Sequence, residues 1–195
     1  MPSADNVRIG QTGLCEVAPL GTELPATGTA ALDAAFVDLG EVSEDGLEHA
    51  FSTDYSTVKN WAGSVLRSFN TSTEVTFKLT FLETSADVLS IFYGQTATDA
   101  DGALDVKISH PEPDPRALVI TVIDGDDLKR YCMSNVQVTE RGTVNDKNSE
   151  ATAYELTFTA NFDSELDGFG YLQTVPPGGQ FSAPKAKKAP AIPAA

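Results

Sequence analysis

The chain has 195 residues, 28 of them acidic and 13 basic, and its formal net charge is −15. Its hydrophobic share of 41% excludes a wholly disordered chain, and its length favours one domain with a sizeable core. No apolar run approaches the ~18 residues that a membrane-spanning helix needs, and the excess of acids disfavours adhesion to nucleic acid or anionic membranes.

The first part of the chain predicts a short strand and an extended arm. Residues 13–19 are compatible with a strand, while residues 19–35 are rich in Pro, Gly, Thr and Ala and lack a regular apolar pattern. We therefore expect residues 12–35 to form an extended arm. A further strand is predicted at residues 36–42.

Residues 43–69 show neither clean strand periodicity nor clean helix periodicity. They open with acids that include Glu44 and Asp45, and they contain Trp61, the only tryptophan of the chain. A long polar connection inside a compact β domain is usually functional or disordered. We predict a long loop that becomes ordered on binding another copy of the chain. Trp61 is then either a contact buried on assembly or an aromatic of the core.

The clearest strand covers residues 73–82, where apolar and polar side chains alternate strictly. Ser85 is a suitable N-cap and Gly94 a suitable C-terminal stop, so the sequence predicts a short helix over residues 86–93. Apolar residues three and four apart on this helix would pack against the sheet.

Further strands are predicted at residues 104–109, 117–124, 128–139, 154–162 and 168–175, with turns at 98–102 and at Asp124-Gly125. The fold class is therefore mainly β, a sandwich or barrel of about eight strands with one short flanking α-helix. This domain would span residues 1–175. Residues 176–195, rich in Pro, Ala and Lys, would form a disordered tail.

No pattern in the chain predicts catalysis, a cofactor or a metal site. His49 and His110 have no Cys or His at ligand spacing, and a turn explains Asp99-Ala100-Asp101-Gly102 better than a calcium loop. No glycine-rich nucleotide motif is present. The start of the chain has no signal-peptide pattern, so we expect a cytosolic product with reduced cysteines. Because no catalytic motif is found, we also expect no enzymatic activity.

Several short motifs follow one another in a distinctive order. They are GTELP at 21–25, FVDLG at 36–40, SEDGL at 43–47, STVKNWAG at 56–63 and a strand, LETS and helix series at 73–94. This series resembles the tail tube (major tail) proteins of long-tailed, siphovirus-type bacteriophages, particularly those that infect actinobacteria. The resemblance is close over about half of the chain, and the C-terminal half shares only the general β pattern.

The resemblance implies a structural virion protein whose six copies close a ring. Rings would stack into a tail tube, an acidic-lined conduit that lets genomic DNA leave without specific binding. Tape measure, tail terminator and tail-tip proteins would be its partners, with no membrane involved. The protein would assemble in the host cytoplasm and reside in the virion tail.

In the family, the arms and the long loop reach a neighbouring subunit or ring, which carries over here to residues 12–35 and 43–69. We expect the contacts to come from Glu44, Asp45, Tyr55, Lys59, Trp61 and Arg67. Strand acids such as Glu155 or turn acids such as Asp105 are candidates for lining the tube. Two other classes remain compatible with the pattern: a tube protein of a non-phage injection or secretion device, and a soluble ligand-binding β-sandwich.

Overall fold

The computed structural model describes residues 7–175, so the tail predicted at residues 176–195 lies outside the described residues. The elements in chain order are β1 (Thr12–Pro19), β2 (Val37–Asp38), β3 (Glu48–Lys59), β4 (Val65–Phe81), α1 (Ala86–Tyr93), β5 (Ala97–Ala100), β6 (Ala103–Val106), β7 (Arg116–Asp124), β8 (Asp127–Arg141), β9 (Tyr154–Ala160) and β10 (Tyr171–Val175). The prediction of a mainly β fold with one helix is confirmed.

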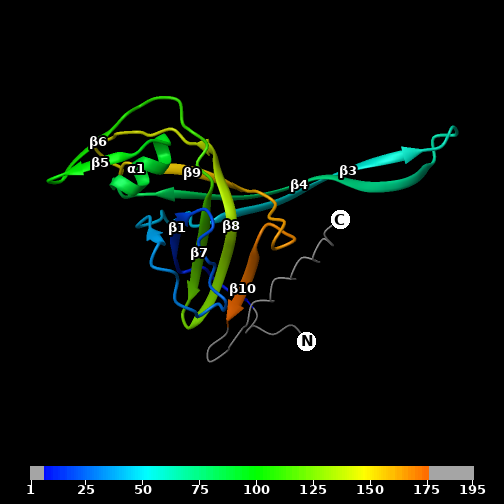
Figure 1. The fold of residues 1–195 in the computed structure, drawn as a ribbon, viewed down its shortest axis with the longest axis horizontal. Helices are drawn as coiled ribbons and strands as arrows, with labels where there is room; N and C mark the ends of the chain where they lie inside the picture. Colours follow the sequence, from blue (N-terminus) through cyan, green and yellow to red (C-terminus); the bar gives the residue numbers. More distant parts are fainter. Residues whose placement is uncertain (1–6, 176–195) are drawn as a thin grey trace, which may run out of the picture.

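Eight of the strands form one antiparallel sheet (Figure 1). Seven of them follow the order β2-β1-β7-β8-β9-β4-β3, and the eighth, β10, pairs with β8. The long strand β8 has two successive neighbours on one of its edges: β10 pairs with Leu128–Cys132, and β9 pairs with Val136–Arg141. Strands β5 and β6 form a separate hairpin. The turn predicted at 98–102 takes in three residues of strand β5, and the actual turn of the hairpin is Asp101-Gly102.

The core lies against one face of the large sheet. Cross-strand partners share a face, so the pairing of Cys15 with Ile120, and of Phe77 with Phe158, aligns apolar side chains from neighbouring strands. Helix α1 covers this face with four buried residues, Val88, Leu89, Ile91 and Phe92. The helix spans the predicted residues because the Ser85 hydroxyl accepts a hydrogen bond from Val88 N, and because Gly94 adopts a left-handed conformation with φ 63°.

Residues 20–36 cover the opposite face of the sheet near β8 and β10. Pro25 and Gly28 are buried there, and the guanidinium of Arg130 donates a 2.9 Å hydrogen bond to the carbonyl of Ala30. A Cβ at Gly28 would collide with Val175, so only glycine fits this close approach.

The predicted extended arm over residues 12–35 is therefore wrong in two respects. Its first part, residues 12–19, is strand β1, which lies within the sheet between β2 and β7, so the short strand predicted at residues 13–19 is confirmed and the arm is not. Its later part packs on the protein's own body. The Pro- and Gly-rich composition correctly indicated irregular backbone, but it carries no information about the surface on which small side chains pack.

Candidate functional site

Strands β3 and β4 form a long hairpin that extends away from the body (Figure 1). The last residues of β4, Val75–Phe81, also pair with β9, whereas residues 65–74 pair with β3 alone. The prediction that residues 43–69 form a long loop is thus wrong, because residues 48–59 and 65–69 are strands. Both faces of the projecting part meet solvent, so the alternation that marks a half-buried strand does not arise there.

Local features shape this hairpin into an ordered ribbon. Its register shifts between Asp54 and Tyr55 and again between Val58 and Lys59, and such bulges increase the twist of a ribbon. At its end, the Asn60 side-chain oxygen accepts a 2.8 Å hydrogen bond from Ser64 N. The end of the hairpin is therefore a defined turn within a single chain.

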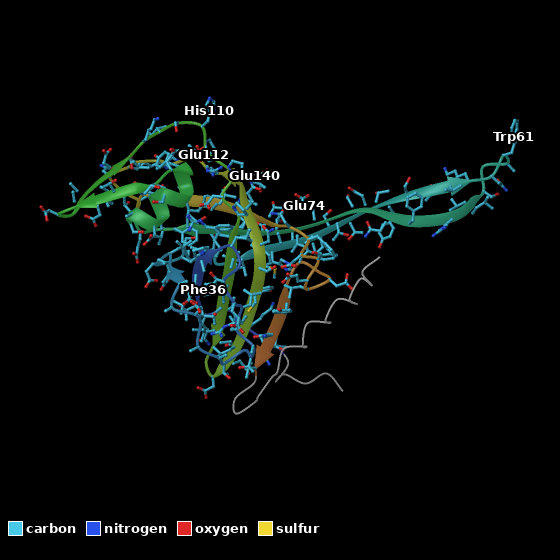
Figure 2. The ribbon with its side chains drawn as sticks, in the orientation of Figure 1. Phe36, Trp61, Glu74, His110, Glu112 and Glu140 are labelled. Atoms are coloured by element: carbon cyan, nitrogen blue, oxygen red, sulfur yellow. The ribbon has the colours of Figure 1, made fainter. Side chains whose placement is uncertain are left out.

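The hairpin exposes an unusual amount of apolar surface. Of the sixteen large hydrophobic residues exposed in the described chain, seven lie on it: Phe51, Tyr55, Val58, Trp61, Val65, Leu66 and Phe69. Trp61 is fully exposed at its end, away from the body (Figure 2), so it is not a core aromatic. A two-stranded ribbon is marginally stable alone, and a contiguous exposed apolar surface marks an interaction site.

Apolar groups occur on both faces of the hairpin. Phe51 pairs with Val75 and therefore lies on the face that continues into the core. On the opposite face, Ser56 pairs with Phe69 and Val58 pairs with Arg67. A partner that buried these groups would have to contact the ribbon from both sides.

The structure divides the predicted contact residues into two groups. Tyr55, Lys59, Trp61 and Arg67 lie together on the distal hairpin, residues 55–69, which holds no acid. Glu44 and Asp45 do not join them. They lie in a turn on the body, where Gly46 N donates to the Ser43 carbonyl, and they line a concave groove of about 660 Å³ beside Tyr131 and Lys129.

A second surface, which the sequence analysis did not define, is the face of the sheet opposite the core on β3, β4, β9 and β8. We call it the polar sheet face; its members are Glu48, Ala50, Ser52, Glu74, Thr76, Lys78, Thr80, Gln137, Thr139, Glu140, Glu155, Thr157 and Thr159. None of these residues is buried. Two of them, Glu74 and Glu140, are labelled in Figure 2.

The charge on the polar sheet face is four glutamates against one lysine. Lys78 Nζ lies 2.9 Å from a carboxylate oxygen of Glu155, and this hydrogen bond raises the pKa of Lys78. The hydroxyls of Thr139 and Thr159 are 2.8 Å apart. The alternation of polar and apolar residues in β4 and β9 was the sequence signal for this surface, and it correctly indicated that Glu155 faces solvent. Asp105, the other acid suggested for the tube lining, does not lie on this face but on β6.

The two outer strands of the sheet, β2 and β3, each have one edge that pairs with no other strand of the described residues. In the described residues β3 pairs only with β4, and β2 pairs only with β1. The β2 edge is very short and sets Glu16 opposite Asp38. Burial and the nearby Asp38 carboxylate raise the pKa of Glu16. Short edges with charges resist uncontrolled strand pairing, whereas a closed assembly removes such edges.

Residues 7–175 offer little support for a metal site, a reactive cysteine or a membrane-spanning helix. No group of three or more His, Cys, Asp or Glu side chains there is arranged to hold a metal. Cys15 and Cys132 are buried free thiols, and burial raises the pKa of Cys132 to about 12. The one helix described, α1, has eight residues, and no helix among the described residues is long and apolar enough to cross a membrane.

Comparison with known proteins identifies the family. Residues 1–175 match the family described as phage tail tube protein. No curated protein matches the chain in sequence.

Several solved structures resemble the chain at low sequence identity. The sheath–tube complex of an extracellular contractile injection system (PVC, extended state) has a chain with a TM-score of 0.51 and 9% identity, covering 88% of this chain and 95% of that one. A chain of the tube-terminating cap of the anti-feeding prophage has a TM-score of 0.47 and 12% identity, covering 90% of this chain and 96% of that one. A chain of the native gene transfer agent virion has a TM-score of 0.41 and 14% identity, covering 87% of this chain and 100% of that one.

The likeness to a chain of the injection-system sheath–tube complex shows the fold alone, whereas the family match extends over most of the chain. The chain belongs to the phage tail tube protein family.

Proposed function

We propose that this protein polymerises as stacked hexameric rings into the tail tube of a bacteriophage, through which the genomic DNA is ejected. The observation that carries this proposal is the projecting hairpin β3–β4, whose exposed apolar residues have no partner within the described chain. Burying them against further copies would give each subunit a reason to assemble.

The open sheet supports a ring. An edge that is unpaired in one subunit can pair with a different edge of the next subunit, and such heterologous contacts close into a ring when the rotation fits. The edges at β2 and β3 are the candidates in this chain. A ring formed in this way would join the sheets of neighbouring subunits.

The polar sheet face supports a conduit for DNA. It is rich in threonine, it exposes no large apolar side chain, and it carries four glutamates with a single lysine. Facing the lumen, it would repel phosphates and offer no cluster of bases to bind them. DNA would then move past it without adhering.

The partners and the location follow from this role. A tube of defined length needs a tape measure protein inside it, a tail terminator at one end and a tail tip at the other. Assembly would take place in the host cytoplasm, and the mature protein would reside in the virion tail. Membership of the tail tube family also supports a structural role in place of an enzymatic one.

Electron microscopy of the purified protein at high concentration, alone and with a tail-tip seed, tests the proposal. We expect sixfold rings and tubes. A protein that stays monomeric under all these conditions and binds a glycan would be a ligand-binding β-sandwich instead. A tube from a non-phage injection device would also form rings, and the neighbouring genes would distinguish it.

A further inference from the structure

The molecule has chemically different ends. Figure 1 shows the hairpin β3–β4 at one end of the long axis and α1, β5 and β6 at the other. The distal hairpin carries Lys59 and Arg67 and no acid. Residues 83–115, which include α1, β5, β6 and the loop that follows, carry seven acids and a single lysine. The two ends are therefore complementary in charge.

A groove lies beside α1 in this acidic region; we call it the α1 groove. Its volume is about 440 Å³, and its lining includes Val17, Val37, Ile91, Asp87, Glu112 and Arg116. Val37 is 42% exposed and so offers uncovered apolar surface. Val17 and Ile91 are themselves buried, so the groove combines a small apolar surface at Val37 with acids, and both suit the apolar, basic end of the hairpin.

The charges within the α1 groove favour a cationic occupant. The one base, Arg116, already lies 2.6 Å from a carboxylate oxygen of Asp114, which also lines the groove. Asp87 and Glu112 take part in none of the ion pairs found in residues 7–175. Two carboxylates therefore remain for two incoming bases.

We propose that the α1 groove receives the distal hairpin of a second copy of this chain, with Lys59 and Arg67 beside Asp87 and Glu112. This inference rests on the proposed tube. A contact between the hairpin of one copy and the groove of another is heterologous and leaves a free hairpin and a free groove, so it can repeat from copy to copy. We assign it to the contact between rings, because the sheet edges are then left for the contacts within a ring.

The concave groove beside Glu44 and Asp45 is the rival acceptor. It is larger, and its lining includes four acids that join no ion pair in the described part of the chain, Glu41, Glu44, Asp45 and Asp124. It also contains Lys129, whose ammonium group has no carboxylate partner within the described residues and would repel an incoming base. Its other base, Arg8, is paired with Asp127 at 2.9 Å. The α1 groove holds no such unneutralised base.

Zero-length carbodiimide coupling on tubes of the unmodified protein tests the contact directly, because it joins an amine to a carboxylate that it touches. We expect mass spectrometry to find Lys59 joined to Asp87 or Glu112 of another copy. Coupling of Lys59 to Glu44, Asp45 or another acid of the concave groove would overturn the proposal.

A charge exchange provides the second test. Reversing both hairpin bases (Lys59→Glu with Arg67→Glu) should raise the concentration required for assembly by at least about tenfold, because like charges then face each other. Adding Asp87→Lys and Glu112→Lys should restore assembly. The matched control adds Glu44→Lys and Asp45→Lys, which are equally exposed, and should not restore it.

The outcomes separate the two proposals. Failure of the unmodified protein to form rings or tubes would refute the proposed function, and with it this inference. If the unmodified protein forms tubes, but assembly of the charge-reversed hairpin variant is restored only by the control pair or by neither pair, the assignment to the α1 groove alone is overturned. Circular dichroism of each variant monomer would establish that lost assembly does not reflect lost folding.

Discussion

Truncation of Trp61 should separate assembly from folding more clearly than any other single substitution. The indole is fully exposed at the end of the hairpin and makes no contact with the core. In Trp61→Ala we therefore expect the free energy of unfolding of the monomer to change by no more than about 0.5 kcal/mol, as for surface substitutions generally.

The effect on assembly follows from the area that the indole can bury. An aromatic side chain buries roughly 150–250 Å². At about 25 cal/mol per Å², this burial contributes at most about 4–6 kcal/mol per contact. Ordering and desolvation reduce that figure, so a loss of about 2–4 kcal/mol per contact is the expected range for an interface hot spot. This corresponds to a weakening of at least about 30-fold.

Two measurements on the same preparation check this prediction: the thermal midpoint of the monomer, and the concentration at which tubes sediment. Leu172→Ala, which truncates a half-exposed side chain on β10, is the control and should change neither by a comparable amount. Phe77→Ala, in the core, should lower stability by about 3–5 kcal/mol. A sharp fall in the midpoint of Trp61→Ala, or normal tubes at normal concentration, would refute the reasoning.

Three further predictions concern other parts of the molecule. Replacing residues 55–71 by an Asn-Gly turn should leave a folded monomer with an unchanged midpoint and abolish tubes in micrographs, since this part of the hairpin pairs only with itself; a molten monomer would contradict it. Glu16→Gln should stabilise the monomer at pH 7 by roughly 0.2–1 kcal/mol, because Glu16 faces Asp38. The pKa of Glu16 is raised in the folded state, so this gain should vanish as pH falls below about 4.3, where the carboxyl is protonated in both states, and an equal gain at both pH values would contradict it. Glu74→Lys with Glu140→Lys should leave rings intact but make tubes retain DNA in a salt-dependent manner, measured by co-sedimentation; tubes that still bind no DNA would argue against a lumenal polar sheet face.

Local chemistry made much of the fold predictable. The alternation in β4 and β9 and the cap of α1 at Ser85 act within a few residues, so they are visible in the sequence. Strand β7 was also visible, because it is apolar along most of its length.

The remainder depended on contacts between distant residues. Residues 25–30 lie on the body because Arg130 and Gln173, a hundred or more positions away, donate hydrogen bonds to the carbonyls of Ala30 and Pro25. The hairpin escaped detection because its two strands satisfy each other's backbone groups without burying a face. The polar sheet face required knowledge of which strands are neighbours. A strand pattern identifies a solvent-facing side chain, but it does not indicate which others share its surface.

The ordered hairpin also changes the mechanism expected for assembly. A loop that folded only on binding would lose conformational entropy at each contact, at a cost of roughly 1–2 kcal/mol for every residue fixed. Here strands β3 and β4 are already paired, and Asn60 already closes the turn, so most of that loss occurs when the chain folds. Each binding event then orders only side chains, and a contact as small as the end of one hairpin can contribute net affinity. In the proposed assembly, the acidic body would oppose random association through repulsion, and the preformed hairpin would supply both affinity and direction.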